Sequence, residues 1–284
     1  MDDEVTPPTV PAPRNLPVGG RDDDIDGSGS LVPAVTRAGA VLDLLADNGG
    51  LPAGPSELAR RLGLPKSSIA NICSALADIG LVRRVGTGFA LGRRLAELGG
   101  AYLAAVDQIE EFYEACRLLP TGSEETVQLA VLDGLEVTYL ARHDGQQPVR
   151  LTSQIGHRLP ASVTAPGKAA LASLDVRELE RRLAGLGALP VLTARSHRTL
   201  DALRADLDRV RRRGYAIDDE ETVEGVVCFG VSIPGRRPSE GPYAASITLL
   251  KARADDDRVP ALVTDLRWLA ERLSDPLRVD RPPG

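Results

Sequence analysis

The sequence predicts an α+β protein in which a winged helix-turn-helix precedes a domain built on an antiparallel sheet. Residues 31–91 carry three helical patterns followed by two extended runs around a glycine turn. Beyond Pro120 a tight-turn dipeptide joins two strand patterns, and further helices and strands follow. The 284 residues suffice for two modest cores, because domains usually span roughly 100 to 200 residues.

The first 30 residues are predicted to form a disordered acidic tail. They are rich in Pro, Gly and Asp, and such a composition buries too little apolar surface to offset chain entropy. Two Arg stand against seven acidic residues, a net charge of −5. The tail is either a solvated leader without a role or an acidic arm that competes for a basic surface.

Three helices are predicted next. Apolar residues at helical spacing indicate the first, over Val35–Asn48, and the second, over Ser56–Leu62. Gly63 separates the second from a third helix over Pro65–Ile79, since proline is well tolerated in the first turn of a helix. Gly80 caps this third helix.

A β-hairpin wing follows the third helix. Leu81–Val85 and Phe89–Leu91 are extended runs around a turn at Gly86–Gly88. An amphipathic stretch over residues 92–106 is expected to be a linker helix. The predicted winged helix-turn-helix therefore occupies residues 31–91.

The remainder, residues 107–276, is expected to be one domain, followed by a tail over 277–284. Asp133-Gly134 supplies the backbone angles of a tight hairpin turn. The domain is therefore expected to be an antiparallel α+β sandwich, not a parallel sheet. The predicted strands are Thr126–Leu132, Leu135–Arg142, Val149–Ser153, Val226–Ile233 and Tyr243–Leu250, and the predicted helices are Ala165–Leu174, Val176–Leu186, Leu200–Arg213 and Val259–Leu273.

The polar side of the third helix is a candidate surface for duplex DNA. The second helix of a helix-turn-helix enters the major groove N-terminus first, so its early polar residues face outward. The candidates are Lys66 for a phosphate, Ser67 and Ser68 for phosphates or base edges, Asn71 for a base edge, and Arg83 and Arg84 at the wing base for phosphates.

Charge distribution agrees with this interpretation. The whole chain has a net charge of −6, but residues 31–100 carry eight basic against five acidic residues, a net charge of +3. Binding to nucleic acid depends on where cations cluster rather than on their sum. A winged helix that binds only proteins remains the main alternative, and its affinity for DNA would show no salt dependence.

Three segments together resemble the IclR family of transcriptional regulators. They are SELARRLGLPKSSIANICSALADIGLVRR (Ser56–Arg84), IGHRLPASVTAPGKAALA (Ile155–Ala172) and RGYAIDDEETVEGVVCFGVSI (Arg213–Ile233). The resemblance implies a GAF-like effector-binding domain, homodimers or homotetramers, and regulation of operons for degrading small organic compounds, by repression or activation. Ser162, Pro166 and Ser232 depart from the family pattern near the presumed pocket, so the effector is not transferred from a relative.

The candidate effector site combines a helix N-terminus with a sheet face. Thr164 is expected to cap the helix that begins near Ala165 and to leave the N–H groups of Gly167 and Lys168 free for a ligand carboxylate. Pro166 preorganises this turn. The family resemblance places effector contacts at Ala165, Pro166, Val226, Cys228, Ser246 and Thr248.

No catalytic, metal or cofactor site is expected. Cys228 in an apolar strand is usually an inert core residue; as a nucleophile it would need a base from His143, His157 or His197, and no oxyanion signature accompanies it. His and Cys lack metal-ligand spacing. Lys168 is expected to be solvated or structural. The acidic cluster Asp218, Asp219, Glu220, Glu221 and Glu224 is expected to be a solvated loop and helix start, or, by the family pattern, a set of hydrogen bonds that holds a lid over the pocket.

The expected location is the cytoplasm. No apolar run reaches the ~18 residues of a membrane helix, and the N-terminus is acidic rather than basic and apolar. Three widely spaced cysteines, Cys73, Cys116 and Cys228, argue against a disulfide framework.

Overall fold

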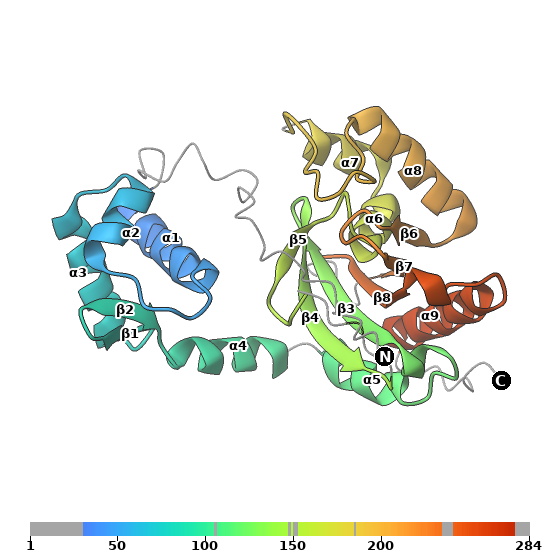
Figure 1. Ribbon diagram of the computed structural model, residues 1–284, viewed down its shortest axis with the longest axis horizontal. Helices are drawn as coiled ribbons and strands as arrows, with labels where there is room; N and C mark the ends of the chain where they lie inside the picture. Colours follow the sequence, from blue (N-terminus) through green and yellow to red (C-terminus); the bar gives the residue numbers. More distant parts are fainter. Residues whose placement is uncertain are drawn as a thin grey trace, which may run out of the picture. The chain divides into compact units, whose positions relative to one another are not determined.

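A computed structural model describes residues 31–104, 107–146, 149, 153–184, 186–234 and 241–275 (Figure 1). The chain divides into two compact units at residues 105 and 106. Each unit has a hydrophobic core of its own. None of the described helices is both long and apolar enough to span a membrane.

The N-terminal unit is a winged helix-turn-helix, as predicted. Gly63 ends the second helix in the left-handed region, at a φ of 66°, which only glycine adopts without cost. A core of Val41, Leu45, Leu58 and Ile69 holds the three helices together. The elements are α1 (Pro33–Asp47), α2 (Pro55–Leu62), α3 (Lys66–Asp78), β1 (Val82–Val85), β2 (Gly88–Leu91) and α4 (Arg94–Ala104).

The wing is anchored to the helices through an additional pairing that the sequence did not indicate. β1 and β2 pair antiparallel, with Val82 opposite Leu91. Phe89 of β2 also forms an isolated bridge with Ala53, and their backbones exchange two hydrogen bonds of 2.9 Å. The segment before α2 therefore acts as a third, very short strand beside the wing.

The C-terminal unit is built on one antiparallel six-stranded sheet in the order β5-β4-β3-β8-β7-β6. The expected antiparallel topology is confirmed, and among the described residues it forms one sheet rather than two packed sheets. The strands are β3 (Thr126–Asp133), β4 (Glu136–Asp144), β5 (Arg158–Pro160), β6 (Ala216–Asp219), β7 (Val226–Ile233) and β8 (Tyr243–Leu250). The helices are α5 (Asp107–Cys116), α6 (Ala165–Ser173), α7 (Val176–Leu183), α8 (Leu200–Arg213) and α9 (Arg258–Ser274), with 3₁₀ turns at Gly122–Glu124 and Lys251–Arg253.

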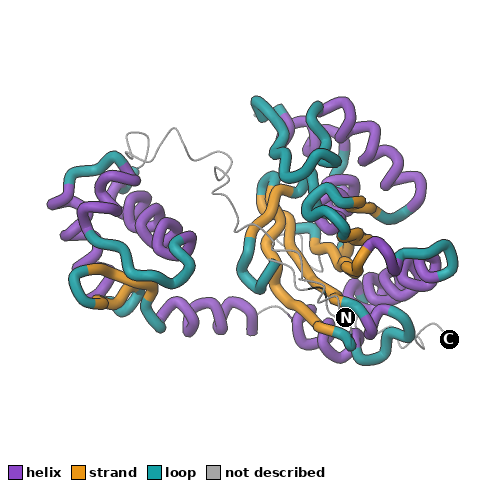
Figure 2. Tube along the Cα trace, in the orientation of Figure 1, coloured by secondary structure: helices purple, strands orange, loops and turns teal. Residues whose placement is uncertain are grey.

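Helices cover both faces of this sheet (Figure 2). α5 and α9 pack together on one face, and α6 lies on the other, beneath α8. Every residue of α6 from Ala165 to Ala172 is buried, which is typical of a helix enclosed on all sides. The N-terminus of α6 therefore points into the interior of the unit.

One predicted strand is wrong. Val149 and Ser153, the two ends of the predicted strand, are not in a strand, and residues 150–152 lie outside the described residues. The edge strand beside β4 is instead β5, in which Leu159 pairs with Val137. Helix α5 and the short edge strands β5 and β6 were not predicted.

Candidate functional site

The polar residues predicted to read DNA lie on the outer side of α3. Lys66, Ser67 and Asn71 are exposed, and Ser68 is half-buried. The opposite side of the helix buries Ile69, Cys73 and Leu76 in the core. Residues on one side of α3 thus hold the helix in place and leave the other side available for contact.

The two arginines at the wing base differ in their contacts. Arg84 donates to Ser74 Oγ at 2.9 Å, and its guanidinium carbon lies 5.0 Å from the centre of the Phe89 ring. Arg84 therefore ties the wing to α3 and is only partly available to a phosphate. Arg83 is exposed and makes no ion pair within the described part of the chain.

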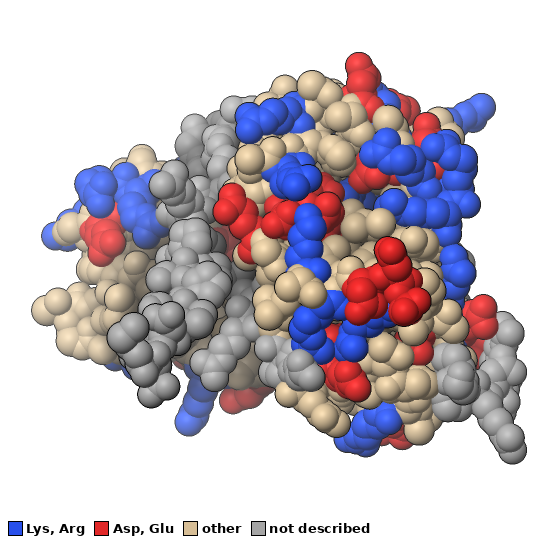
Figure 3. Space-filling model, turned by 45° about the vertical axis from the view of Figure 1, so that its right-hand side comes forward, with Lys and Arg blue, Asp and Glu red and all other residues tan. Residues whose placement is uncertain are grey.

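Several arginines of the C-terminal unit are paired with acidic residues. Figure 3 shows acidic and basic side chains intermixed over the middle of the face, with basic side chains gathered along its right-hand edge. Arg204 of α8 pairs with Glu180 of α7 at 2.7 Å, and Arg211 pairs with Asp208 at 2.9 Å. Such pairs neutralise much of the charge that a nucleic acid would need.

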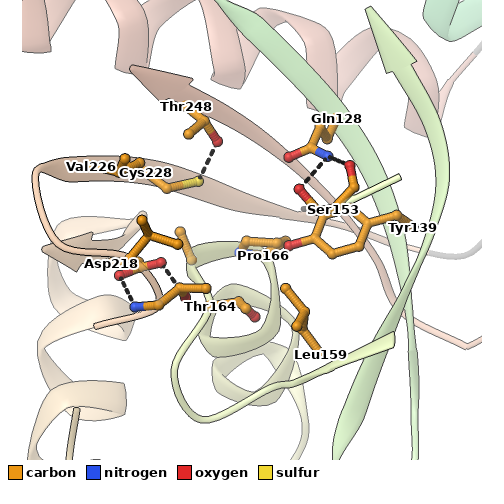
Figure 4. Close-up of a pocket in the computed structure, with 13 residues that line it drawn as sticks. Gln128, Tyr139, Ser153, Leu159, Thr164, Pro166, Asp218, Val226, Cys228 and Thr248 are labelled. Carbon is orange, nitrogen blue, oxygen red and sulfur yellow. Dashed lines mark hydrogen bonds between the residues drawn. The ribbon is translucent and has the colours of Figure 1, made fainter. Parts of the chain in front are cut away.

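A pocket lies in the C-terminal unit where the sheet meets the N-terminus of α6 (Figure 4). It holds about 370 Å³ of empty space, including its open mouth. Side chains from β3, β4, β7 and β8 line one side, and α6 and the turn between β6 and β7 line the other. The lining residues are Gln128, Tyr139, Ser153, Leu159, Thr164, Ala165, Pro166, Asp218, Thr222, Val223, Val226, Cys228 and Thr248.

The strand register places a row of polar side chains on the pocket side of the sheet. Thr126, Thr248, Cys228 and Asp218 lie opposite one another across β3, β8, β7 and β6. Thr248 Oγ1 lies 3.1 Å from Cys228 Sγ. Residues directly opposite on neighbouring strands share a face, so Asp218 belongs to the same surface as Cys228 and Thr248.

Gly230 allows the sheet to approach α6 closely. A Cβ at this position would lie 2.6 Å from the carbonyl carbon of Ala165 and 2.9 Å from the nitrogen of Pro166. Both are backbone atoms that cannot swing away. Because Gly230 has no side chain, the start of α6 can lie directly against β7. This close approach sets the position of the pocket wall.

The N-terminus of α6 is capped as predicted, but the N–H groups of Gly167 and Lys168 are not free. Thr164 Oγ1 accepts from the Gly167 N–H at 3.2 Å, and Lys168 N–H donates to Thr164 O at 2.9 Å. Pro166 has no N–H. The expected carboxylate site on the amides of Gly167 and Lys168 is therefore wrong, because the helix and its cap use both.

The structure brings together six of the eight predicted effector residues. Thr164, Ala165, Pro166, Val226, Cys228 and Thr248 all line the pocket. Gly167 does not; it packs against the backbone of Ala161. Ser246 does not line it either; its Oγ is buried without a hydrogen-bond partner among the described residues.

Sequence reasoning missed the β3 and β4 wall of the pocket. Gln128 donates to Ser153 O at 3.2 Å and lies near Ser153 Oγ at 3.1 Å. A register shift between Leu129 and Ala130 pairs Ala130 with Tyr139, whereas Gln128 pairs with Arg142. This bulge turns Tyr139 towards the pocket, which simple alternation along β4 would not predict.

Two residues of the acidic cluster are buried, contrary to the expectation of a solvated loop and helix start. Asp218 Oδ1 accepts from the N–H groups of Glu221 at 2.7 Å and Thr222 at 3.2 Å. The Thr222 hydroxyl lies 2.6 Å from Asp218 Oδ2 and 3.0 Å from Val163 O. Burial raises the pKa of Asp218, and these hydrogen bonds and Lys168 oppose the rise. The segment is a hydrogen-bonded turn that closes one side of the pocket.

Lys168 is structural and fully buried behind this turn. Its Nζ donates to Asp206 Oδ2 at 2.9 Å and to Glu221 Oε1. Burial works against ionisation of Asp206, yet the hydrogen bond from His197 and the charge of Lys168 hold its pKa well below the ordinary value. Burial raises the pKa of Glu221.

His197, Asp206 and Glu221 form the one described cluster with metal-ligand spacing, their ligand atoms lying within 4.8 Å of one another. His197 Nε2 lies 3.1 Å from Asp206 Oδ2. The Lys168 ammonium contacts both carboxylates and supplies the positive charge that a metal would otherwise bring. The cluster is therefore accounted for as a buried ion network.

Cys228 is not suited to nucleophilic catalysis. Burial raises the pKa of its thiol to about 12, so almost no thiolate exists at neutral pH. His197, one of the bases considered, is bonded to Asp206 instead.

A winged helix-turn-helix with an exposed polar face, followed by a separate domain with a pocket of its own, is the arrangement of two-domain transcription regulators. The family model "Bacterial transcriptional regulator IclR C-terminal" matches residues 100–275, and "IclR helix-turn-helix domain" matches residues 34–86. The chain belongs to the IclR family of bacterial transcriptional regulators.

Curated relatives agree with this assignment. The transcriptional repressor IclR of Escherichia coli K12 is 32% identical over 236 residues, covering 80% of this chain and 84% of the relative. The acetate operon repressor of Salmonella typhimurium is 33% identical over 239 residues, covering 81% and 85%. These relatives and both matched domains are regulators, not enzymes.

Solved structures share the fold. A transcriptional regulator from Rhodococcus sp. RHA1 is 27% identical with a TM-score of 0.70, covering 86% of this chain and 97% of that chain. The IclR regulator from Alicyclobacillus acidocaldarius is 23% identical with a TM-score of 0.74, covering 86% and 98%. The latter likeness concerns the fold alone.

Proposed function

We propose that this protein is a cytoplasmic, ligand-responsive regulator, acting as a repressor of a catabolic or metabolic operon. The exposed polar side of α3 carries the proposal, because Lys66, Ser67 and Asn71 are held outward by a buried opposite side. In this proposal Lys66 and Arg83 contact phosphates, Ser67 and Ser68 contact phosphates or base edges, and Asn71 contacts a base. Two curated relatives are named as repressors, one of an acetate operon.

The pocket in the C-terminal unit is the proposed effector site. An IclR homologue from Microbacterium hydrocarbonoxydans, 23% identical, with a TM-score of 0.61, was crystallised as a complex with 4-hydroxybenzoate. A small molecule in this fold is thus a reasonable expectation. Residues 31–91 would then be the output domain, 92–106 a linker, and 107–276 the sensor.

Self-association completes the proposal. A single recognition helix gives little affinity, so a homodimer or homotetramer that reads half-sites about one helical turn, ~34 Å, apart is expected. Ligand binding would change DNA affinity by a coupling free energy between the two sites.

The test is binding of the full chain to a fragment from its own upstream region across a salt series. Counterion release predicts a slope of about −0.9 in log affinity against log salt for each phosphate neutralised. Lys66→Ala should weaken binding to all sequences about equally and reduce that slope by about one, while Asn71→Ala should relax preference at one base pair.

A competing function, a winged helix that binds only proteins, predicts a different result. Neither a salt slope nor a preference over random duplex would then be seen, and the DNA-binding proposal would be wrong. If Lys66→Ala and Asn71→Ala weakened binding to all DNA sequences equally, Asn71 would not contact a base.

A further inference from the structure

We propose that the acidic segment, residues 1–30, binds the basic side chains of the winged helix-turn-helix and competes with DNA for them. The inference rests on the proposed function, in which α3 and the wing contact DNA, and it adds a regulation of that contact. The segment is then an acidic arm rather than a solvated leader without a role.

The acidic segment and the unit that follows it carry opposite charges. Residues 1–30 have a net charge of −5, and residues 31–100 have a net charge of +3. Charges of opposite sign on neighbouring parts of one chain attract each other without a shaped binding site. The segment therefore has a partner of complementary charge directly beside it in the sequence.

Most basic side chains of the N-terminal unit are not engaged by its own residues. They are exposed, apart from the half-buried Arg61, so their charge is open to an external anion. The side chains that form neither a hydrogen bond nor an ion pair with any described residue are Arg60, Arg61, Lys66, Arg83, Arg93 and Arg94.

The C-terminal unit offers the acidic segment less. Arg142 pairs with Asp144 at 2.8 Å, and Arg253 and Arg258 both contact the buried Glu125 at 2.6 Å. The segment would have to displace such local acids, whereas the cations of the winged helix-turn-helix have none to displace. This difference favours the N-terminal unit as its partner.

The acids closest to α1 have a charge spacing similar to that of a DNA strand. Asp22, Asp23 and Asp24 are consecutive, and Asp26 follows. An extended chain advances about 3.3–3.6 Å per residue, and one DNA strand carries a phosphate about every 3.4 Å. The acidic run can therefore offer the same cations a density of negative charge close to that of the phosphates.

The length of the chain allows this contact. The residues between Asp24 and Pro33, the first residue of α1, can span up to about 30 Å. The 15 residues of α1 itself extend over about 22 Å. Because the segment is covalently joined to the unit, its effective concentration there is of millimolar order, so a weak contact suffices for competition.

The experiment compares DNA binding by the full chain with that of two changed chains. One lacks residues 2–28, and the other carries Asp22→Asn, Asp23→Asn and Asp24→Asn together. Fluorescence anisotropy gives the Kd for a fragment from the protein's own upstream region and for a random duplex, each at about 50 mM and about 200 mM salt.

Both changed chains should bind DNA more tightly than the wild type at low salt. At about 50 mM salt the expected gain is at least about threefold for the shortened chain and about twofold for the triple variant. At about 200 mM it should fall below about 1.5-fold, because salt screens the competing contact. The gain should be equal for both duplexes, since competition for phosphate contacts carries no base information.

A matched control removes the same charge from the C-terminal unit. Glu114→Gln, Asp256→Asn and Asp257→Asn together alter three exposed acids that form no ion pair within the described residues. This variant should bind DNA within about 1.5-fold of the wild type, because it changes only the overall repulsion between protein and DNA.

A double-mutant cycle assigns the contact to the proposed cations. In a chain that also carries Lys66→Ala and Arg83→Ala, DNA binding is weaker, but the gain from the three Asn substitutions should fall below about 1.5-fold. An undiminished gain would mean that the segment does not bind these cations, and the inference would be wrong.

The remaining outcomes separate the two proposals. If the wild type and both changed chains bind DNA equally at low salt, the acidic segment does not compete, and the DNA-binding proposal still stands. An equal gain in the control would assign the effect to general repulsion and would overturn the inference alone. If no chain binds DNA with a salt slope, both proposals fail. The triple variant decides even if the shortened chain does not fold.

Discussion

Lys168 and the two carboxylates around it depend on one another. Lys168 is fully buried in the first turn of α6, and Asp206 of α8 and Glu221 beside β6 are also buried. A charge in the interior is tolerated only when its partners remain. These three side chains therefore join α6, α8 and the turn that closes the pocket.

Lys168→Met should lower the free energy of unfolding by about 3–5 kcal/mol at pH 7, because it removes the buried cation that contacts the carboxylates of both Asp206 and Glu221. In the wild type the lowered pKa of Asp206 contributes stability above its unfolded pKa. In the variant the pKa of Asp206 and that of Glu221 should be higher than in the wild type, because the charge of Lys168 lowers both, so protonation of these carboxylates relieves the loss of stability as the pH falls. Urea unfolding at several pH values measures the free energy of unfolding of both proteins. The difference between wild type and variant should become smaller from pH 7 towards about pH 4.

Lys251→Met is the matched control, because Lys251 pairs with Asp219 and Glu220 at the surface. Exposed pairs contribute little, so this variant should unfold like the wild type. If both variants lost the same free energy of unfolding, the burial of Lys168 would not be the cause of the destabilisation.

The pocket residues that could be predicted are those placed by a helix cap or by the alternation of side chains along a strand. A Thr before Ala-Pro-Gly predicts a helix cap, and strand alternation places Val226 and Cys228 on one face; both side chains do line the pocket. Tyr139 depends on a bulge, and Asp218 on a turn whose hydrogen bonds bury it. Neither feature leaves a periodic signal in the sequence.

At the scale of elements, the contact between β7 and α6 rests on Gly230. Gly230→Ala should destabilise the protein by about 1–3 kcal/mol and weaken ligand binding, because the new methyl group meets the backbone of Ala165 and Pro166. Thermal unfolding with and without ligand measures both effects.

Gly99→Ala provides the comparison for this substitution. Gly99 lies in α4, and a Cβ there meets nothing within 4 Å. Alanine favours a helix by about 0.5–1 kcal/mol over glycine, so this variant should be as stable as the wild type or more so. If Gly230→Ala left both the stability and ligand binding unchanged, that result would contradict the close approach of β7 to α6.

Long, periodic elements were predictable, and short or polar ones were not. Strands β7 and β8 and helix α8 have the bounds that the sequence predicts. β6 has only four residues, Ala216–Asp219, and its two acids suggested a loop. In α5, Ile109, Phe112 and Cys116 recur at helical spacing, which favours a helix. The acidic residues between them make this apolar pattern weak.

At the scale of the whole molecule, the two units have independent cores. The first is centred on Val41, Leu58 and Ile69, and the second on residues such as Leu171, Leu203 and Leu207. A compact unit with its own core can in principle fold alone.

A fragment of residues 107–276 should therefore fold and bind effector with the Kd of the full chain, within about twofold. Circular dichroism and calorimetry check this. The fragment should not bind DNA, because α3 and the wing lie in the other unit. A fragment that unfolds, or that loses ligand affinity, would show that the sensor requires the N-terminal unit.

The burial of the three cysteines makes the protein a natural background for site-specific labelling. Cys73, Cys116 and Cys228 are all buried, and burial raises the pKa of each thiol. An exposed thiolate attacks maleimide reagents, so a cysteine introduced at an exposed position outside the candidate DNA contacts, such as Asp78 at the end of α3, would react selectively without removal of the native ones. A fluorophore there would report the arrival of an operator on α3, and its signal during effector titration would follow the change in DNA binding in real time.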